Sequence, residues 1–389
     1  KTKISKIKSI PMRKNVLLSV LFLISFLSKA QSVKIDTIPF TTTSSLLVFK
    51  GQINGVETDF VLDTGAAIGV ITSAKASDTK IRIAGKKNIT DSNENVNSMS
   101  EALIETVTIG SFEIKNIKSV VYDMPFLACN NYYLLGANAI NKLNWKIDFE
   151  KKLLYVSKST FEYSDEMLEM PINYKNNRHF TTFNIHETEF KNCLVDLGYN
   201  DFFEVSEKEP FFKKLKQENQ DAIISGSRLT MSLSNMEINK YETLSFDNLM
   251  IGNTRFDDLK IEIRANIENK IGLKFFSQLS SIMILNNDNS KYYLKLSNKP
   301  ISLQMSFDAD CFLKNGKLII VGKNNNSQSS ATELATEEEI KSINGLTAID
   351  FKDECDFLLW RIENLKKDSY EIEKLNGQKI IIKKQVLKS

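Results

Sequence analysis

The feature that most constrains this chain is one sequence pattern that occurs twice. In the first copy, the apolar run Phe60–Leu62 leads into Asp63-Thr-Gly65. In the second copy, the apolar run Cys193–Val195 leads into Asp196-Leu-Gly198. Short apolar runs that end in turn residues are typical of buried strands, and a glycine permits a tight turn after each aspartate. The repeated pattern therefore predicts two similar β units in one chain.

The repeat continues downstream in the same order. Residues 107–117 match residues 249–259, and Leu134-Leu-Gly136 matches Lys270-Ile-Gly272. The interval from the aspartate to this late glycine is 73 residues in the first copy and 76 in the second. We expect a helical turn and a hairpin after each late glycine. A lone Asp-Thr-Gly would be read as a strand-ending turn, but four ordered matches indicate an internal duplication.

Length and composition are those of a globular protein with more than one core. The chain has 389 residues, of which 42% are hydrophobic and 25% charged, and this length exceeds what a single core usually serves. Between residues 46 and 157, short alternating or apolar runs are broken by Asn, Gly, Asp and Ser. This pattern predicts an antiparallel all-β unit.

The N-terminal region has the pattern of a signal peptide. Met12-Arg-Lys14 precedes an apolar run of 12 residues, Val16–Leu27, and Ser28-Lys-Ala30 supplies small residues for cleavage. A membrane anchor is the alternative, but spanning a bilayer takes about 20 apolar residues. We expect residues 12–30 to be a signal peptide and residues 1–11 an upstream extension. The mature protein would then be exported, periplasmic or secreted, without a stable membrane anchor.

Charge and motif content exclude several function classes. Without residues 1–30, the 51 basic and 48 acidic residues become 44 and 48, so the formal net charge changes from +3 to −4. A mildly acidic chain without a basic block gives no indication of nucleic-acid binding. The two histidines, His179 and His186, form no zinc motif, and we expect each to be structural or on the surface. No phosphate-binding glycine loop occurs, so neither a metal nor a cofactor is predicted.

The four cysteines are too few and too scattered for a disulfide-dense scaffold. They are Cys129, Cys193, Cys311 and Cys355. Export would permit one or two disulfides, and we favour a pair between Cys311 and Cys355.

The duplicated aspartates can support hydrolysis if the two units pack about a pseudo-twofold axis. Asp63 and Asp196 would then meet at the seam, where two adjacent carboxylates cannot both ionise easily and share one proton. The ionised carboxylate can take a proton from a water molecule while the protonated one hydrogen-bonds the scissile carbonyl. Such a pair needs neither a metal nor a covalent intermediate.

These motifs resemble those of the pepsin and retropepsin superfamily, specifically bacterial retropepsin-like proteins with two lobes in one chain. The resemblance covers about residues 35–298. It implies a mainly β fold with two tandem acid-protease lobes, residues 35–160 and 165–300, related by pseudo-twofold symmetry. It also implies an aspartic-type endopeptidase that acts on polypeptide or peptide substrates. The residues that carry the resemblance are Asp63-Thr-Gly65-Ala66, Leu134-Leu-Gly136, Asp196-Leu-Gly198 and Ile271-Gly272.

By this resemblance, Asp63 and Asp196 are the catalytic aspartates. The supporting residues of the active-site loops are Thr64, Gly65, Gly198, Gly136 and Gly272. The family also closes a hairpin flap over the substrate, and the candidate stretches are residues 88–100 in the first lobe and 225–235 in the second.

One position departs from the family pattern. The residue after each aspartate normally braces the two loops through its hydroxyl, which Thr64 can do and Leu197 cannot. A loop without this hydroxyl could be looser or displaced, so the alternative is a catalytically weak or inactive protease-like protein that binds peptides. A further alternative is a structural β protein in which Asp63 and Asp196 lie far apart.

The residues after Pro300 predict a small α+β domain, residues 308–389. It contains a strand at Lys317–Val321, a helix around Phe357–Ile362 and a strand at Lys379–Ile382. The order of elements, with Glu339–Gly345 as strand and turn, resembles a bacterial PDZ domain. The resemblance implies capture of a peptide tail at a sheet edge. No glycine-rich carboxylate loop is evident, so a structural role in docking against the lobes stays open as an alternative.

Overall fold

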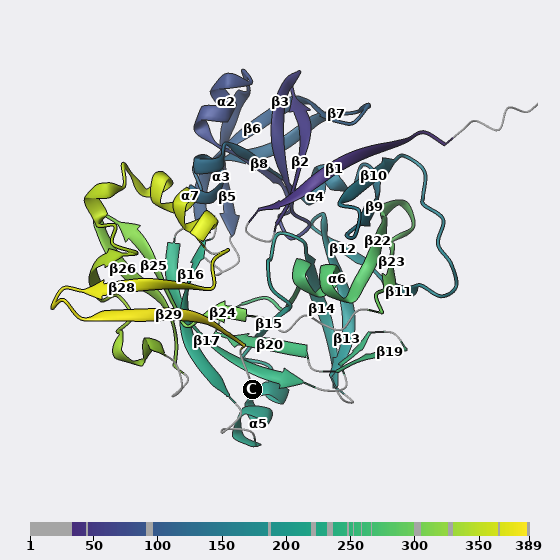
Figure 1. The fold of residues 1–389 in the computed structure, drawn as a ribbon. Helices are drawn as coiled ribbons and strands as arrows, with labels where there is room; N and C mark the ends of the chain where they lie inside the picture. Colours follow the sequence, from purple (N-terminus) through teal and green to yellow (C-terminus); the bar gives the residue numbers. More distant parts are fainter. Residues whose placement is uncertain are drawn as a thin grey trace, which may run out of the picture. The chain divides into compact units, whose positions relative to one another are not determined.

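The computed structural model describes most of the chain beyond Ser32 (Figure 1). The chain divides into two compact units, residues 1–34 and 35–389, and the description below concerns the second. The expected upstream extension and signal peptide, residues 1–11 and 12–30, lie outside the described residues. No helix in the described part is long and apolar enough to cross a membrane. The described ranges are 33–43, 46–90, 96–185, 188–218, 223–231, 236–246, 249–251, 253–257, 259–265, 267–298, 305–325, 330–364 and 366–386.

The first repeat is mainly β, as its alternating apolar pattern predicts. Its elements are β1 (Ile35–Thr43), β2 (Leu46–Ile53), β3 (Val56–Leu62), β4 (Gly69–Ile71), α2 (Ser73–Asp78), β5 (Arg82–Thr90), β6 (Val96–Ile109), β7 (Phe112–Val121), α3 (Pro125–Asn130), β8 (Tyr132–Leu135), α4 (Ala137–Ile140), β9 (Asn144–Asp148) and β10 (Leu153–Ser157). The expected helical turn and hairpin after Gly136 are α4 and β9–β10, and this prediction is confirmed.

The expectation of a purely antiparallel unit is wrong for two strand pairs. β3 runs parallel to β8, and β4 runs parallel to β7, whereas β2–β3, β5–β6 and β6–β7 are antiparallel. A parallel pair needs a long connection, and the stretch between Leu62 and Tyr132 supplies it. Local alternation of apolar residues does not reveal strand direction, so the sequence pattern could not show this pairing.

The second repeat has a similar, but not identical, order of elements. They are β11 (Leu168–Pro171), β12 (Asn173–Lys175), β13 (Arg178–Ile185), β14 (Thr188–Asp196), β15 (Phe203–Ser206), α5 (Pro210–Glu218), β16 (Ile224–Met231), β17 (Met236–Phe246), β18 (Leu249–Ile251), β19 (Thr254–Phe256), β20 (Leu259–Arg264), β21 (Lys270–Gly272), α6 (Leu273–Leu279), β22 (Ser280–Asn286), η2 (Asn287–Asn289) and β23 (Lys291–Leu296). Again two strand pairs are parallel, β14 with β21 and β15 with β20. The helix and hairpin expected after Gly272 are α6 and β22–β23.

The terminal hairpins of the two repeats join in one sheet. β22 pairs antiparallel with β9, with Ile282 opposite Asp148 and Leu285 opposite Trp145. The strand order through this region is β11-β23-β22-β9-β10-β1, so main-chain hydrogen bonds connect the two repeats. Trp145 is fully buried here, and a single hydrophobic cluster includes residues of both repeats. This shared sheet fixes the repeats relative to each other.

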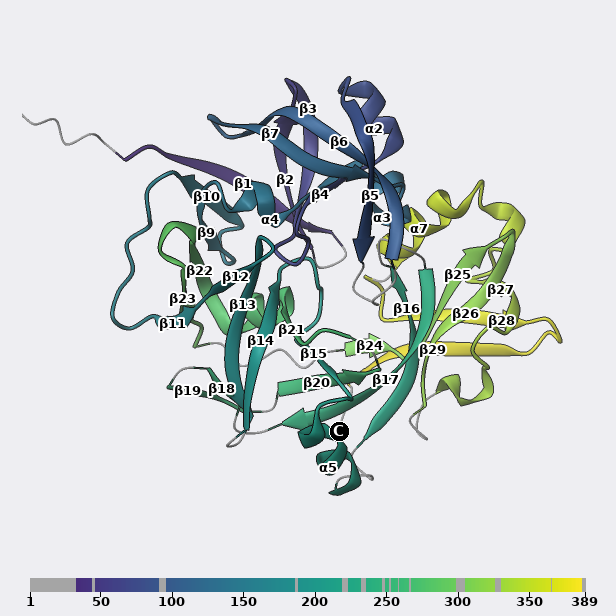
Figure 2. The same ribbon diagram turned by 180° about the vertical axis from the view of Figure 1, so that it is seen from behind.

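The C-terminal part has its own hydrophobic core. Its elements are β24 (Met305–Phe307), β25 (Ala309–Lys314), β26 (Lys317–Asn324), η3 (Ser330–Glu333), β27 (Glu339–Ile343), η4 (Ala348–Asp350), α7 (Glu354–Asn364), β28 (Ser369–Lys374) and β29 (Lys379–Val386). The predicted strands and helix therefore occur. β26 also pairs with β16 of the second repeat, where Gly226 is opposite Asn324 and Ser227 opposite Lys323 (Figures 1 and 2).

The expected disulfide between Cys311 and Cys355 is wrong. Cys355, near the start of α7, is bonded to Cys129 of α3, with a Cα–Cα distance of 5.0 Å. Cys311 lies on β25 in the core of the C-terminal part and Cys193 is buried on β14, and both are free thiols. The disulfide covalently joins the first repeat to the C-terminal part.

Candidate active site

Asp63 lies directly after β3, where the parallel neighbour β8 holds the chain. The Asp63 amide donates to the Leu135 carbonyl at 3.1 Å. One carboxylate oxygen, Oδ1, accepts hydrogen bonds from the amides of Gly65 at 2.8 Å and Ala66 at 2.9 Å. The side chain is thus held in the turn by backbone donors on a rigid strand end.

Asp196 is the last residue of β14, and its side chain is held in a similar way. Its Oδ1 accepts from the Gly198 amide at 2.9 Å. A second correspondence lies three residues after each aspartate: the Ala66 carbonyl accepts from the Ala137 amide, and the Tyr199 carbonyl accepts from the Leu273 amide, both at 2.8 Å. The two active-site turns are therefore built by equivalent hydrogen bonds.

The structure brings the two aspartates together, with each carboxylate against the glycine of the other turn. A Cβ atom placed on Gly65 would lie 2.5 Å from Oδ1 of Asp196, and one on Gly198 would lie 2.5 Å from Oδ2 of Asp63. No side chain fits in such a space, so both positions require glycine for close approach. This arrangement differs from the one expected for a structural β protein with its aspartates far apart.

Thr64 joins the two turns through its buried hydroxyl. Its Oγ1 donates to the Val195 carbonyl at 2.6 Å and accepts from the Leu197 amide at 3.0 Å. Leu197, expected as the weak point of the second turn, is fully buried and belongs to the main hydrophobic cluster. The second turn is therefore held by Thr64 from one side and by apolar packing from the other.

The two late glycines allow close passage of the chain beneath each turn. A Cβ on Gly136 would lie 2.6 Å from the Gly69 amide nitrogen, and one on Gly272 would lie 2.7 Å from the Tyr199 carbonyl oxygen. Both predicted support positions are therefore next to the aspartate turns, where a larger residue would displace backbone.

Burial and proximity raise the pKa values of both aspartates. Burial raises the pKa of Asp63 to about 7, the charge of Asp196 adds to this, and the Ala66 and Gly65 amides oppose it. Burial also raises the pKa of Asp196, but the Lys270 ammonium opposes that shift. A pair that retains one proton near neutral pH can act as acid and base together.

A buried charged group beside Asp196 was not predicted from the sequence. Lys270 Nζ lies 2.7 Å from Oε2 of Glu204, and both residues are buried. Arg264 also pairs with Glu204, at 2.5 Å. The signal was present in the repeat, because Lys270 stands where the first copy has Leu134.

Two hairpins correspond to the candidate flaps. In the first repeat, β5 and β6 form an antiparallel hairpin whose β5 strand is largely exposed. In the second, β16 and β17 form the equivalent hairpin, and its Leu229, Met231 and Met236 pack against the C-terminal core. Residues 91–95 and 232–235, which belong to the expected flap stretches, lie outside the described residues.

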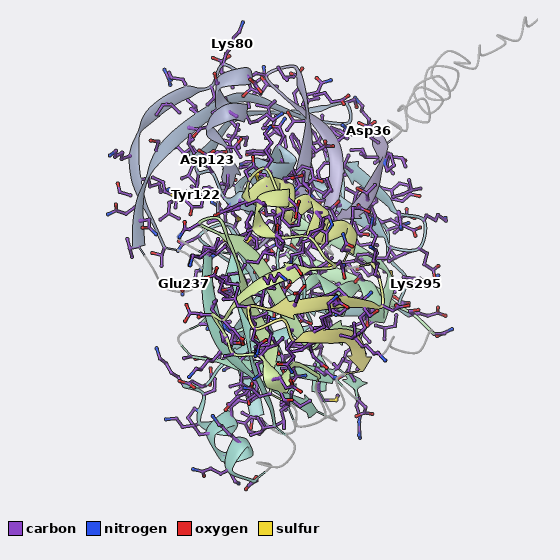
Figure 3. All side chains as sticks on the ribbon, turned by 60° about the vertical axis from the view of Figure 1, so that its left-hand side comes forward. Asp36, Lys80, Tyr122, Asp123, Glu237 and Lys295 are labelled. Atoms are coloured by element: carbon purple, nitrogen blue, oxygen red, sulfur yellow. A yellow bond between two sulfur atoms is a disulfide. The ribbon has the colours of Figure 1, made fainter. Side chains whose placement is uncertain are left out.

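An apolar cluster lines the first repeat on the face that carries Asp63. Its buried members are Val48, Val61, Val70, Met99, Val120, Leu127 and Leu134. Tyr122, labelled in Figure 3, follows β7 and packs against this cluster. Met99 contributes from β6, so the flap-like hairpin shares in this apolar wall.

Neither histidine was expected to take part in catalysis or to bind a metal. His179 is buried, contacts Asn141 and Tyr292, and has its pKa lowered to about 3 by burial, so its role is structural. His186 lies outside the described residues. Within the described ranges, no group of three or more His, Cys, Asp or Glu side chains could hold a metal ion.

One family model and two solved structures are similar to parts of this chain. Residues 49–142 match the family model "gag-polyprotein putative aspartyl protease". No curated protein matches significantly. Among solved structures, the chain is similar to a retropepsin-like aspartic protease from Rickettsia conorii, with 24% identity, a TM-score of 0.25, and coverage of 32% of this chain and 92% of that one. It is also similar to an aspartic proteinase from Irpex lacteus, with 11% identity, a TM-score of 0.42, and coverage of 68% and 98%. The family model spans Asp63 and Gly136, so the first repeat has the sequence pattern of an aspartyl protease.

Proposed function

We propose that this chain is an exported aspartic-type endopeptidase in which Asp63 and Asp196 activate one water molecule. The observation that carries the proposal is the mutual placement of the two carboxylates, each 2.5 Å from a Cβ position on the opposite glycine. Raised pKa values for both aspartates support the sharing of one proton. The match to the aspartyl protease family model supports the reaction class.

The proposed reaction needs one ionised and one protonated carboxyl group. The ionised group takes a proton from water, whose oxygen attacks the peptide carbonyl carbon. The protonated group donates to the carbonyl oxygen, and a tetrahedral diol forms. The carboxyl group that took the water proton then passes it to the amide nitrogen, while the other carboxylate takes a proton back from a hydroxyl of the diol. The C–N bond breaks, the products are a carboxylic acid and an amine, and the pair again holds one proton. Because the pKa of Asp63 is about 7, hydrolysis should decline above that pH as the acid is lost.

The equivalent hydrogen bonds at Ala66 and Tyr199 support a pseudo-twofold relation between residues 35–160 and 165–300. We assign the closing flap to the β5–β6 hairpin of the first lobe. The β16–β17 hairpin is paired with β26 and packs on the C-terminal core, which restrains it. Substrate would therefore enter beneath the first-lobe hairpin.

The C-terminal part is proposed to be a PDZ-like domain with a docking role. Within the described residues, β25 pairs with β26 alone, and α7 packs beside it. Arg361 of α7 pairs with Asp310 of β25, with Nε 2.8 Å from Oδ1, so this ion pair lies where a peptide tail would add to the strand edge. A fluorescent C-terminal peptide library would detect capture of a tail, and failure of every peptide to bind would leave docking as the domain's role.

Export is proposed from the signal-peptide pattern of residues 12–30. The disulfide between Cys129 and Cys355 supports it, because such bonds persist in oxidising compartments. N-terminal sequencing of the mature protein should begin at Gln31, directly after Ala30. Retention of Met12 in the mature protein would contradict cleavage.

The second candidate is a catalytically weak or inactive protein that binds peptides in the same cleft. Leu197 in place of a hydroxyl residue favours it, whereas the two hydrogen bonds of Thr64 favour an intact site. Purified protein should hydrolyse an unfolded protein substrate, and a statine-type transition-state mimic should inhibit it. Tight binding of peptide without any hydrolysis between pH 3 and pH 8 would favour the second candidate.

A further inference from the structure

Equivalent rows of residues cross the sheet beside each aspartate, and they differ in charge. In the first lobe, paired neighbours are Val120 with Val70, Val70 with Leu134, and Leu134 with Val61. In the second lobe, the corresponding pairs are Glu262 with Glu204, Glu204 with Lys270, and Lys270 with Leu194. Three apolar side chains in one lobe are thus replaced by two glutamates and a lysine in the other. We call Glu262, Glu204 and Lys270 the charged row.

The charged row lies on the face that carries Asp196. Leu194 is two residues before Asp196 on β14, so their side chains point to the same side of the sheet. Lys270 is directly opposite Leu194, which makes it a diagonal neighbour of Asp196 on the adjacent strand. The Lys270 ammonium also lies 4.8 Å from the ring centre of Tyr199, three residues after Asp196.

Lys270 is charged although it is only 7% exposed. Burial lowers its pKa, but the carboxylates of Glu204 and Asp196 outweigh burial and raise the pKa above its usual value. Burial likewise raises the pKa of Glu204, but Lys270, Arg264 and Arg228 outweigh it and bring the pKa to about 2. Lys270 and Glu204 therefore form an ion pair at every pH above about 2 at which Lys270 stays protonated.

The groups around the charged row leave an excess of positive charge. Arg228 pairs with Glu262 at 2.7 Å, and Asp201 lies within 3.7 Å of the same guanidinium. Burial raises the pKa of Glu262 to about 8, so this carboxyl is neutral in acid and at neutral pH. Four cations, Arg228, Arg264, Lys270 and Lys274, then lie around two anions, Asp201 and Glu204. A negative charge on Asp196 reduces this positive excess, whereas Asp63 adjoins the apolar row of the first lobe.

We propose that the Lys270 ammonium holds Asp196 as the ionised carboxylate of the pair and leaves Asp63 to carry the shared proton. This inference rests on the proposed peptidase function and assigns its roles. Asp196 takes the proton from water, and Asp63 donates to the substrate carbonyl. The charged or titratable side chains that act on the Asp196 carboxylate are Asp63, Glu204 and Lys270, and the backbone amides of Gly198 and Tyr199 donate to it. Lys270 acts through Asp196 and is a positioning residue.

The direct test replaces Lys270 by methionine. Loss of a nearby opposite charge raises the pKa of a carboxyl group by about 1–3 units. The acid limb of the pH profile of kcat/KM should therefore move upward by at least about one pH unit in Lys270→Met. The upper limb, set by Asp63, should move less, because Lys270 affects the pKa of Asp63 less than burial, Asp196 and the Ala66 and Gly65 amides do. Lys270→Arg keeps the charge and should restore the wild-type acid limb.

A second variant predicts the opposite shift. Glu204 raises the pKa of Asp196, so Glu204→Gln should move the acid limb to lower pH. Lys291→Met is the matched control, because it removes a surface lysine that pairs with Glu169 at 2.8 Å on the distant strand β23. Opposite shifts in the first two variants, with none in the control, would not result from general loss of stability.

A readout independent of activity separates this inference from the proposed function. Carboxyl-carbon NMR of protein with labelled aspartate, with Asp63→Asn and Asp196→Asn used for assignment, follows both titrations directly. We expect Asp196 to titrate below Asp63, and to titrate at higher pH in Lys270→Met. If Asp196 titrates as in the wild type in both folded variants, Lys270→Met and Glu204→Gln, the inference would be overturned. If the Asp196 titration shifts in Lys270→Met but the wild-type protein cleaves no peptide, only the peptidase function would be overturned.

Discussion

The hydroxyl of Thr64 offers a quantitative test of how the two active-site turns are joined. Thr64→Val keeps the shape of this fully buried side chain and removes one donor and one acceptor. The Val195 carbonyl and the Leu197 amide would then lose their partner at 2.6 and 3.0 Å. A buried polar group left unsatisfied costs about 1–3 kcal/mol. For two such groups we expect a loss of about 2–6 kcal/mol in the free energy of unfolding.

Urea unfolding followed by tryptophan fluorescence measures this loss. The matched control is Thr181→Val, because Thr181 is also buried but makes one hydrogen bond, from Oγ1 to the Pro171 carbonyl at 3.0 Å. We expect the control to lose about 1–3 kcal/mol, since one carbonyl loses its partner.

Activity should separate the same two variants. A misplacement of catalytic groups by about 1 Å can reduce the rate about 100-fold. We therefore expect kcat/KM to fall by about that factor in Thr64→Val and to change little in Thr181→Val. The reasoning would be refuted if Thr64→Val were no less stable than Thr181→Val, or if its kcat/KM equalled that of the wild type.

Three further predictions follow from the site and the disulfide. The pKa of Asp63 is raised in the folded state to about 7, so ionisation of Asp63 lowers the stability of the wild type as pH rises from about 4 to 7. In urea unfolding, Asp63→Asn should therefore equal the wild type near pH 4 and be more stable than it at pH 8 by up to about 4 kcal/mol. Gly198→Ala should reduce kcat/KM at least about 100-fold, because its Cβ would lie 2.5 Å from Oδ2 of Asp63, and activity near wild type would contradict the placement. Cys129→Ser should lose about 2–5 kcal/mol under oxidising conditions and nothing under reducing ones, whereas a reductant that leaves wild-type stability unchanged would contradict a bond between Cys129 and Cys355.

The dyad could be predicted from sequence because its determinants are local. Each aspartate follows a buried strand, each glycine follows two residues later, and the duplication indicates that the two turns form equivalent sites. Proximity of Asp63 and Asp196 then follows from packing of like units. The helix and hairpin after Gly136 were predictable for the same reason, since their pattern lies within about twenty residues.

Contacts between distant segments could not be predicted. The direction of β3 relative to β8 depends on a crossover of about 70 residues, and the pairing of β16 with β26 depends on how the C-terminal part docks. The partner of Cys355 was wrong because sequence spacing says nothing about which helix lies beside α7. Leu197 was expected to weaken its turn because it lacks a hydroxyl. Its burial in the core could not be predicted, since that burial depends on residues from many strands.

The role of Lys270 was not predicted, for a different reason. Its substitution for Leu134 was visible in the repeat, but the meaning of a lysine there depends on Glu204 lying opposite it across β15 and β21. The first lobe has Val70 at the position equivalent to Glu204, so the two changes compensate each other in charge.

The measurement that tests the central claim most directly is hydrolysis by Asp63→Asn and Asp196→Asn. A quenched fluorogenic peptide or an unfolded protein is incubated with each purified variant between pH 4 and pH 7. Asp59→Asn is the matched control, because Asp59 lies on the same strand β3 and forms a surface ion pair with Lys50 at 3.2 Å. We predict that both dyad variants lose hydrolysis at least about 1000-fold while the control retains it. Hydrolysis at the wild-type rate in either dyad variant would contradict the account.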